Sequence, residues 1–136
     1  MHQEVNEELK KMIDNSVAPK VVEPLDKKIG IEDFAKIELK VGKILEAHLI
    51  EGADKLYRFL VDVGEAEPRT ILSGIREFFP DQSIFPGKYV CVVTNLAPRK
   101  MRGFESNGML LFAGGDSAQL FIISPVGEPT PGTIIR

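Results

Sequence analysis

Three cationic side chains, Arg99, Lys100 and Arg102, stand within four residues of one another in the stretch NLAPRKMRGFES. The first acidic residue after them is Glu105. Cations without neighbouring acids raise the local electrostatic potential, and guanidinium and ammonium groups are donors that proteins use to hold phosphate. The spacing predicts a local phosphate clamp. A solvated connection between two strands is the alternative reading of the same residues.

Three further polar residues lie at predicted strand ends. Lys55 follows a tight turn in EGADKLYRF, and a basic side chain at the mouth of a barrel can meet phosphate. Ser73 and Arg76 flank the glycine of LSGIR, where a hydroxyl group can donate to phosphate or to a ribose hydroxyl. Lysines in turns and serines at strand ends also occur in proteins without a ligand there. The case for these three residues therefore rests only on their predicted positions at strand ends.

The remaining sequence offers no set of residues suited to catalysis or to metal binding. His2 and His48 are isolated, and Cys91, the single cysteine, lies in the apolar run KYVCVVTN, as a buried thiol in a reducing compartment would. No phosphate loop, GxGxxG or GxSxG sequence is present. We therefore expect a non-catalytic protein with no catalytic residue, no cofactor and no metal site.

Length and charge restrict the classes of protein further. The chain has 136 residues, 43% of them hydrophobic, which suits one globular domain with some appended polar sequence. Its formal net charge is −3, so a polyanion would have to be held by a local patch. No apolar run approaches the roughly 20 residues that span a bilayer, and the polar start MHQEVNEELKK is unlike a signal peptide. We expect a soluble cytoplasmic protein with no membrane partner.

The first 30 residues differ in composition from the remainder of the chain. Residues 6–14, NEELKKMID, have the periodicity of a short amphipathic helix, with Asn6 as its predicted N-cap. Residues 16–30 contain two prolines and mixed charges, which favour an extended linker. We predict a helix and linker over residues 1–30 and a folded domain over residues 31–136.

From residue 36 onward, hydrophobic and polar residues alternate as they do in β-strands. The first strand is long, and Gly42 in its interior predicts a bulge or a sharp bend. The side chains expected on one face of this strand are Ile37, Leu39, Val41, Leu45, Ala47 and Leu49.

Four more strands follow the first. YRFLVDVG and RTILSGI, joined across GEAEP, predict a hairpin, with Tyr57, Phe59, Val61 and Val63 on one face. REFFPDQSIFPGK predicts a connector with a short helical or irregular piece, and KYVCVVTN and GMLLFAGG predict the fourth and fifth strands. This order indicates an all-β protein, an OB-fold five-stranded barrel, with one or two extra strands in the C-terminal tail.

Three stretches together resemble a known family. DFAKIELKVGKILEAHLIEGADKLYRFLVDVG, TILSGI and VVTNLAPRKMRGFESNGMLLFAG, in this order and spacing, are similar to the tRNA-binding domain of bacterial methionyl-tRNA synthetases and of free-standing tRNA-binding proteins. The resemblance runs from about Ile31 to Arg136, and the NLxPRKMRGxxSxGM element is its most specific part.

The resemblance implies an OB-fold that binds tRNA by its backbone and shape, without regard to the anticodon and without catalysis. It implies that the domain enhances tRNA capture by a methionyl-tRNA synthetase catalytic region, in cis or in trans. The C-terminal segment resembles one that bacterial members use to form a homodimer. The tRNA-binding positions that it implies are Lys55, Ser73, Arg76, Asn95, Arg99, Lys100, Arg102, Ser106 and Met109.

Two other functions stay open at this point. The DFxKxxLxVGxI opening is shared with secretion-chaperone relatives, which would make the chain a dimeric protein-binding module. The acidic net charge is compatible with a purely structural dimerisation domain of a larger enzyme. Whether the chain is an excised domain, a separate subunit or a free-standing protein does not follow from the sequence.

Overall fold

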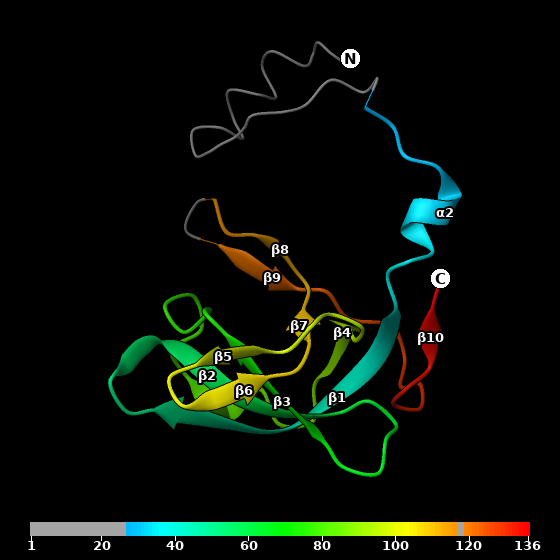
Figure 1. The fold of residues 1–136 in the computed structure, drawn as a ribbon. Helices are drawn as coiled ribbons and strands as arrows, with labels where there is room; N and C mark the ends of the chain where they lie inside the picture. The colour runs from blue at the N-terminus through cyan, green and yellow to red at the C-terminus, as the bar shows by residue number, and fades with distance from the viewer. Residues whose placement is uncertain (1–26, 117–118) are drawn as a thin grey trace.

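The computed structural model describes residues 27–116 and 119–136, and its regular secondary structure is nearly all β, in antiparallel sheets, as predicted (Figure 1). The predicted N-terminal helix and most of the predicted linker lie outside the described residues. In the described part of the chain, no helix is long and apolar enough to cross a membrane. The elements in chain order are α2 Ile31–Phe34, β1 Leu39–Ile50, β2 Ala53–Asp62, β3 Arg69–Ser73, the 3-10 helix Gln82–Ile84, β4 Tyr89–Val93, β5 Arg99–Met101, β6 Phe104–Ser106, β7 Met109–Leu110, β8 Phe112–Gly114, β9 Leu120–Ile122 and β10 Ile134–Ile135.

The main sheet has the order β3-β2-β1-β4-β7, with β10 also pairing β1. The β2–β3 hairpin, the connector with its short 3-10 helix and the fourth strand stand where the sequence predicted them. The edge strands β3 and β7 are linked by bonds to the residues that precede β7. The Asn107 backbone N–H donates to the Thr70 carbonyl at 2.8 Å, and the Leu72 N–H donates to Ser106 Oγ at 2.9 Å. These two bonds join the edges of a curved, OB-like sheet.

The long first strand is bent, but its defect is not at Gly42. Its register against β2 shifts between Ile44 and Glu46, after which Leu45 and Leu49 are 41% and 50% exposed. The prediction that these two leucines lie on a buried face with Val41 was wrong. Ile44 and Ala47 lie opposite the buried Val61 and Phe59, so Leu45 is the extra residue of a bulge between them. Leu49 stands at a second register shift, between Leu49 and Ile50. The residues of β1 that do enter the core are Val41, Ile44, Ala47 and Ile50.

Gly42 has a packing role instead. It pairs regularly with Val90 of β4, and a Cβ at this position would lie 2.8 Å from methyl groups of both Val61 and Val92. Only a residue without a side chain lets β2 and β4 side chains pack this closely over β1. The glycine therefore allows the tight curvature of the sheet rather than a bulge.

The core is formed by the predicted buried face of β2 and by Phe85, which comes from the connector between β3 and β4. Tyr57, Phe59, Val61 and Val63 are at most 1% exposed, as their alternation predicted. Phe85 of the connector is fully buried, with its ring centroid 5.5 Å from that of Tyr57 and 5.0 Å from that of Phe59. The aromatic rings fix the connector over the inner face of the sheet.

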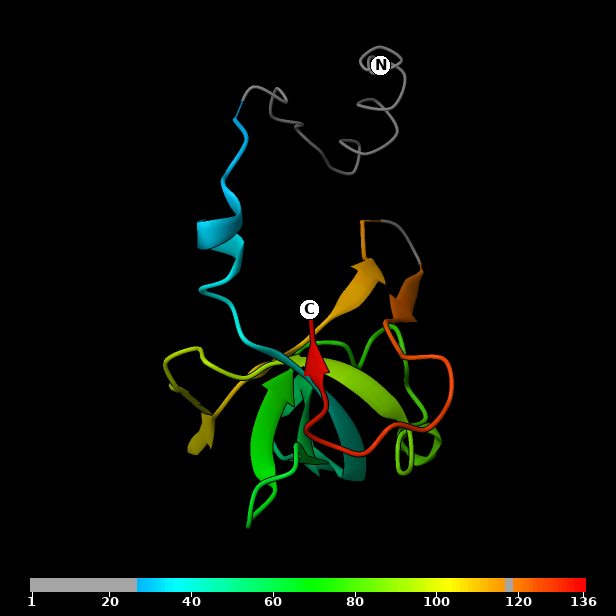
Figure 2. The same ribbon diagram turned by 90° about the vertical axis from the view of Figure 1, so that its right-hand side faces the viewer.

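Two segments after β4 differ from the predicted order. The predicted fifth strand is divided, because Met109–Leu110 pairs with β4 whereas Phe112–Gly114 pairs with Leu120–Ile122 in a separate small sheet (Figure 1). The segment predicted as a loop between the last strands is itself a hairpin of β5 and β6. The C-terminal tail returns to the start of β1 as β10, so of the one or two extra strands predicted there, two are present, β9 and β10 (Figure 2).

Candidate nucleic-acid interface

The β5–β6 hairpin carries the three clustered cations. It turns at Arg102 and Gly103, whose φ angles of 51° and 84° are both positive, as in the two-residue turns that match the twist of paired strands. Arg99, Lys100 and Arg102 are exposed, and none of their side chains forms an ion pair or hydrogen bond within residues 27–116 and 119–136. Lys100 pairs in register with Glu105, yet their side chains form no salt bridge. The three charges are therefore available to an anion.

Two apolar or buried residues hold this hairpin against the sheet. Met101 packs on a small cluster of Ile50, Ala53 and Leu72, with Leu56 beside it. Ser106 is only 6% exposed, and its hydroxyl oxygen accepts the hydrogen bond from the Leu72 backbone. Ser106 thus joins the β5–β6 hairpin to the backbone of β3.

Arg99, Ser106 and Met109 line one groove with a volume of about 370 Å³. Two of its apolar side chains are open to solvent, since Leu96 is 45% and Met109 is 46% exposed. An exposed apolar surface beside cations is suited to a nucleotide, because the base or sugar can contact the apolar side chains while the phosphate contacts the cations. The other residues of this groove are Leu72, Ala97, Met101 and Gly108.

Lys55, Ser73 and Arg76 form a second group where β2 begins and β3 ends. The Arg76 backbone N–H donates to the Lys55 carbonyl at 3.2 Å, and Arg76 Nη1 donates to the Ala53 carbonyl at 3.4 Å. Lys55 Nζ lies 3.8 Å from Glu77 Oε2, but both side chains are more than 60% exposed, so this pair is weak. Ala53 belongs to the cluster on which Met101 packs, so this group and the β5–β6 hairpin lie at the same part of the sheet. We call Lys55, Arg76, Arg99, Lys100 and Arg102 together the cationic rim.

Asn95 differs from the other predicted site residues because both ends of its side chain are occupied. Its Oδ1 accepts from the Glu38 backbone N–H at 2.8 Å, and its Nδ2 donates to the Lys36 carbonyl at 2.7 Å. These bonds fix the chain where it enters β1. The amide therefore holds the approach to β1 in addition to any contact with a ligand.

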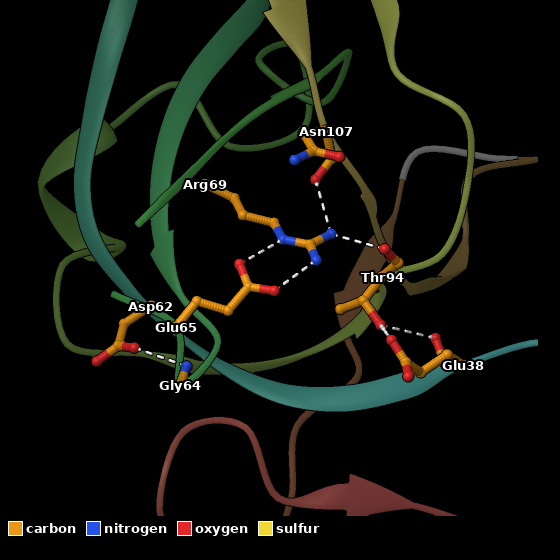
Figure 3. Close-up of polar contacts among 7 residues, drawn as sticks. All are labelled: Glu38, Asp62, Gly64, Glu65, Arg69, Thr94 and Asn107. Atoms are coloured by element: carbon orange, nitrogen blue, oxygen red, sulfur yellow. Dashed lines mark hydrogen bonds and ion pairs between the residues drawn. The ribbon is translucent and has the colours of Figure 1, made fainter. Parts of the chain in front are cut away.

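Arg69 was not singled out in the sequence, and it is the best-satisfied cation near the rim (Figure 3). Its Nε and Nη2 donate to the two carboxylate oxygens of Glu65 at 2.9 and 2.7 Å, and its Nη1 donates to the Thr94 carbonyl at 2.6 Å. The hydrogen bonds and charge of Arg69 lower the pKa of the Glu65 carboxyl, and those of Glu65 raise the pKa of Arg69. Its hydrogen bonds to the Thr94 and Asn107 carbonyls hold these two segments together. Because Glu65 neutralises its charge, Arg69 is not part of the cationic rim.

Comparison with known proteins gives consistent results. Residues 39–134 match the family described as "Putative tRNA binding domain". The methionine–tRNA ligase of Psychrobacter arcticus is 50% identical over 96 residues, which are 71% of this chain and 14% of that protein. The chain spans only 14% to 19% of the lengths of the curated relatives.

Solved structures agree on the fold. A MetRS-related protein from Pyrococcus horikoshii superposes with a TM-score of 0.74 and 33% identity, covering 81% of this chain and 99% of that one. The chaperone CsaA from Bacillus anthracis superposes with a TM-score of 0.71 over 80% of this chain and 99% of that one. At 22% identity, the likeness to CsaA is one of fold alone. The family match extends over residues 39–134, which is more than half of this chain, so the chain belongs to the tRNA-binding domain family.

Proposed function

We propose that this chain is a tRNA-binding module that grips folded RNA through its sugar-phosphate backbone at the cationic rim. The observation that carries the proposal is that the three hairpin cations are exposed and unpaired in the described structure of an otherwise acidic protein. Phosphate contacts position a protein on RNA without reading its sequence. The module would therefore accept many tRNAs through a feature of shape that they share.

The module's work would be non-catalytic and carried out in the cytoplasm with a methionyl-tRNA synthetase catalytic region. The support is the family match together with the ligase relatives, of which this chain corresponds to a small part. A second contact to the same tRNA raises the effective concentration of that tRNA at the catalytic region, whether the two parts are joined or separate. The result would be tighter capture of tRNA without a new chemical step.

The test is a comparison of affinities for different RNAs at one moderate salt concentration. The 136-residue chain is titrated against several unrelated full-length tRNAs, a duplex RNA and a single-stranded RNA of equal length. The proposal expects similar binding to all tRNAs and weaker binding to the other two. Equal, weak binding to every RNA would contradict it, and so would competition by an unfolded peptide that displaces tRNA.

We further propose that two copies of the chain form a two-fold dimer through the C-terminal segment. Ile134 and Ile135 line a groove of about 580 Å³ with α2 and the segment that follows it. Ile31, Phe34 and Ile134 in this groove are 74%, 42% and 47% exposed, an apolar surface that a second copy would cover. Sedimentation equilibrium of the full chain and of an Ile134→Asp variant tests this, and a monomeric wild type would refute it.

A further inference from the structure

Arg58 lies on the outer face of β2, under the β5–β6 hairpin. It pairs in register with His48 of β1 and with Leu72 of β3, so the side chains of these three residues share one face of the sheet. The centre of its guanidinium group lies 4.9 Å from the centroid of the Phe104 ring. Such a stack fixes the plane of the guanidinium group and leaves its edge free to donate hydrogen bonds.

The donors of this guanidinium group have no partner in the described residues. Its Nε is enclosed and makes no hydrogen bond, and the side chain enters no ion pair. The carboxylate that shares this face, Glu46, is bonded instead to His48 Nε2 at 2.6 Å. Buried donors without a partner are rare in folded proteins, and arginine in particular is usually paired when it leaves water.

The position of the stack connects it to the cationic rim. Phe104 follows the Arg102–Gly103 turn directly and is 36% exposed. Leu72, the cross-strand neighbour of Arg58, is the residue whose backbone bonds Ser106 at the base of the same hairpin. Arg58 therefore presents its charge beside the hairpin cations and not on another side of the sheet.

We propose that Arg58 is a further RNA-contacting residue, whose terminal nitrogens donate to a phosphate of bound tRNA while the Phe104 ring holds the guanidinium plane. Arginine suits this task because its planar fork can donate two parallel hydrogen bonds to one phosphate. This inference rests on the proposed function, since it adds a contact to the same RNA surface.

The test measures the dependence of tRNA affinity on salt for variants of the full chain, with one full-length tRNA transcript as the probe. Removal of one phosphate contact lowers the slope of log affinity against log salt by about one unit. Arg58→Met is expected to lower the slope by about one unit relative to the wild type. The same substitution added to the variant with alanine at Arg99, Lys100 and Arg102 is expected to lower the slope of that variant by about one further unit. Phe104→Leu keeps every charge, so it should leave the slope unchanged and weaken binding by about two- to five-fold.

Two results would overturn the assignment. An unchanged slope for Arg58→Met would show that Arg58 touches no phosphate, and an effect that vanishes in the triple-alanine background would show that it acts only through the hairpin. Arg58→Lys provides a second variant that keeps the charge: it should retain the wild-type slope and bind less tightly, and a slope lowered by one would contradict the proposal. A wild-type slope for the triple-alanine variant alone would refute the proposed function independently of Arg58.

Discussion

Replacement of Arg99, Lys100 and Arg102 by alanine is the sharpest perturbation of the cationic rim. All three side chains are exposed and unpaired within the described residues, so their removal takes away charge and leaves no buried group unsatisfied. The residues that anchor the hairpin, Met101 and Ser106, stay in place. We expect the variant to fold with nearly unchanged thermal stability and to bind tRNA less tightly.

The size of the effect follows from the number of contacts. Each neutralised phosphate contributes about 0.7 to 0.9 to the salt slope, so three contacts contribute about two to three units. Between 50 and 200 mM salt, a fourfold change, the wild type should therefore lose about 20- to 40-fold more affinity than the triple variant. At high salt the two proteins should bind with more similar affinity.

Fluorescence anisotropy of a labelled full-length tRNA, titrated at several salt concentrations, measures both slopes. Lys88→Ala is the matched control for Lys100→Ala, because Lys88 is an exposed lysine outside the rim, in the turn before β4, where its carbonyl accepts from the Ile44 N–H at 2.9 Å. Lys100→Ala should lower the slope by about one unit and Lys88→Ala should not. Equal slopes for the wild type and the triple variant would refute the placement of this hairpin in the RNA interface.

Three further predictions concern the scaffold. Ser106→Ala leaves the Leu72 N–H without its partner and should destabilise the protein by about 1 to 3 kcal/mol in urea denaturation. Gly42→Ala places a methyl group 2.8 Å from two core valines, so we expect a loss of about 1 to 3 kcal/mol, read from the thermal midpoint; an unchanged midpoint would contradict the packing argument. Because Arg69 lowers the pKa of Glu65 from its ordinary value of 4.5, this pair stabilises the fold above that pH and loses its effect as the pH falls through the lowered pKa. The stability difference between the wild type and Glu65→Gln should therefore be largest near neutral pH and shrink below pH 4.5, whereas a pH-independent difference would refute the role of the charge.

Sequence periodicity predicted β2 well because every second residue of a regular strand faces the core. Tyr57 and Val61 are buried, as this alternation predicts. The same rule failed on β1, whose register against β2 shifts twice, between Ile44 and Glu46 and between Leu49 and Ile50, and whose Leu45 and Leu49 are exposed beside these shifts. The position of a bulge depends on how two strands pair, which residues of one strand do not reveal.

Sequence patterns likewise reveal only part of the candidate site. Arg99, Lys100 and Arg102 could be singled out because clustered charge is visible in the sequence. Arg58 could not, because its proposed role depends on the stack with Phe104, a residue more than forty positions later in the chain. The bonds that Asn95 makes to the backbone before β1 were hidden for the same reason.

The bond from Leu72 to Ser106 and the bond from Asn107 to Thr70 have a consequence for how this surface can change. The hairpin that displays the cations also covers the backbone of β3, whose unpaired groups would otherwise form an open strand edge. Loss or lengthening of the hairpin would therefore expose a template for intermolecular strand pairing. Variation in RNA affinity should be confined to the outward side chains, while the backbone of the hairpin is preserved to keep the protein from aggregating.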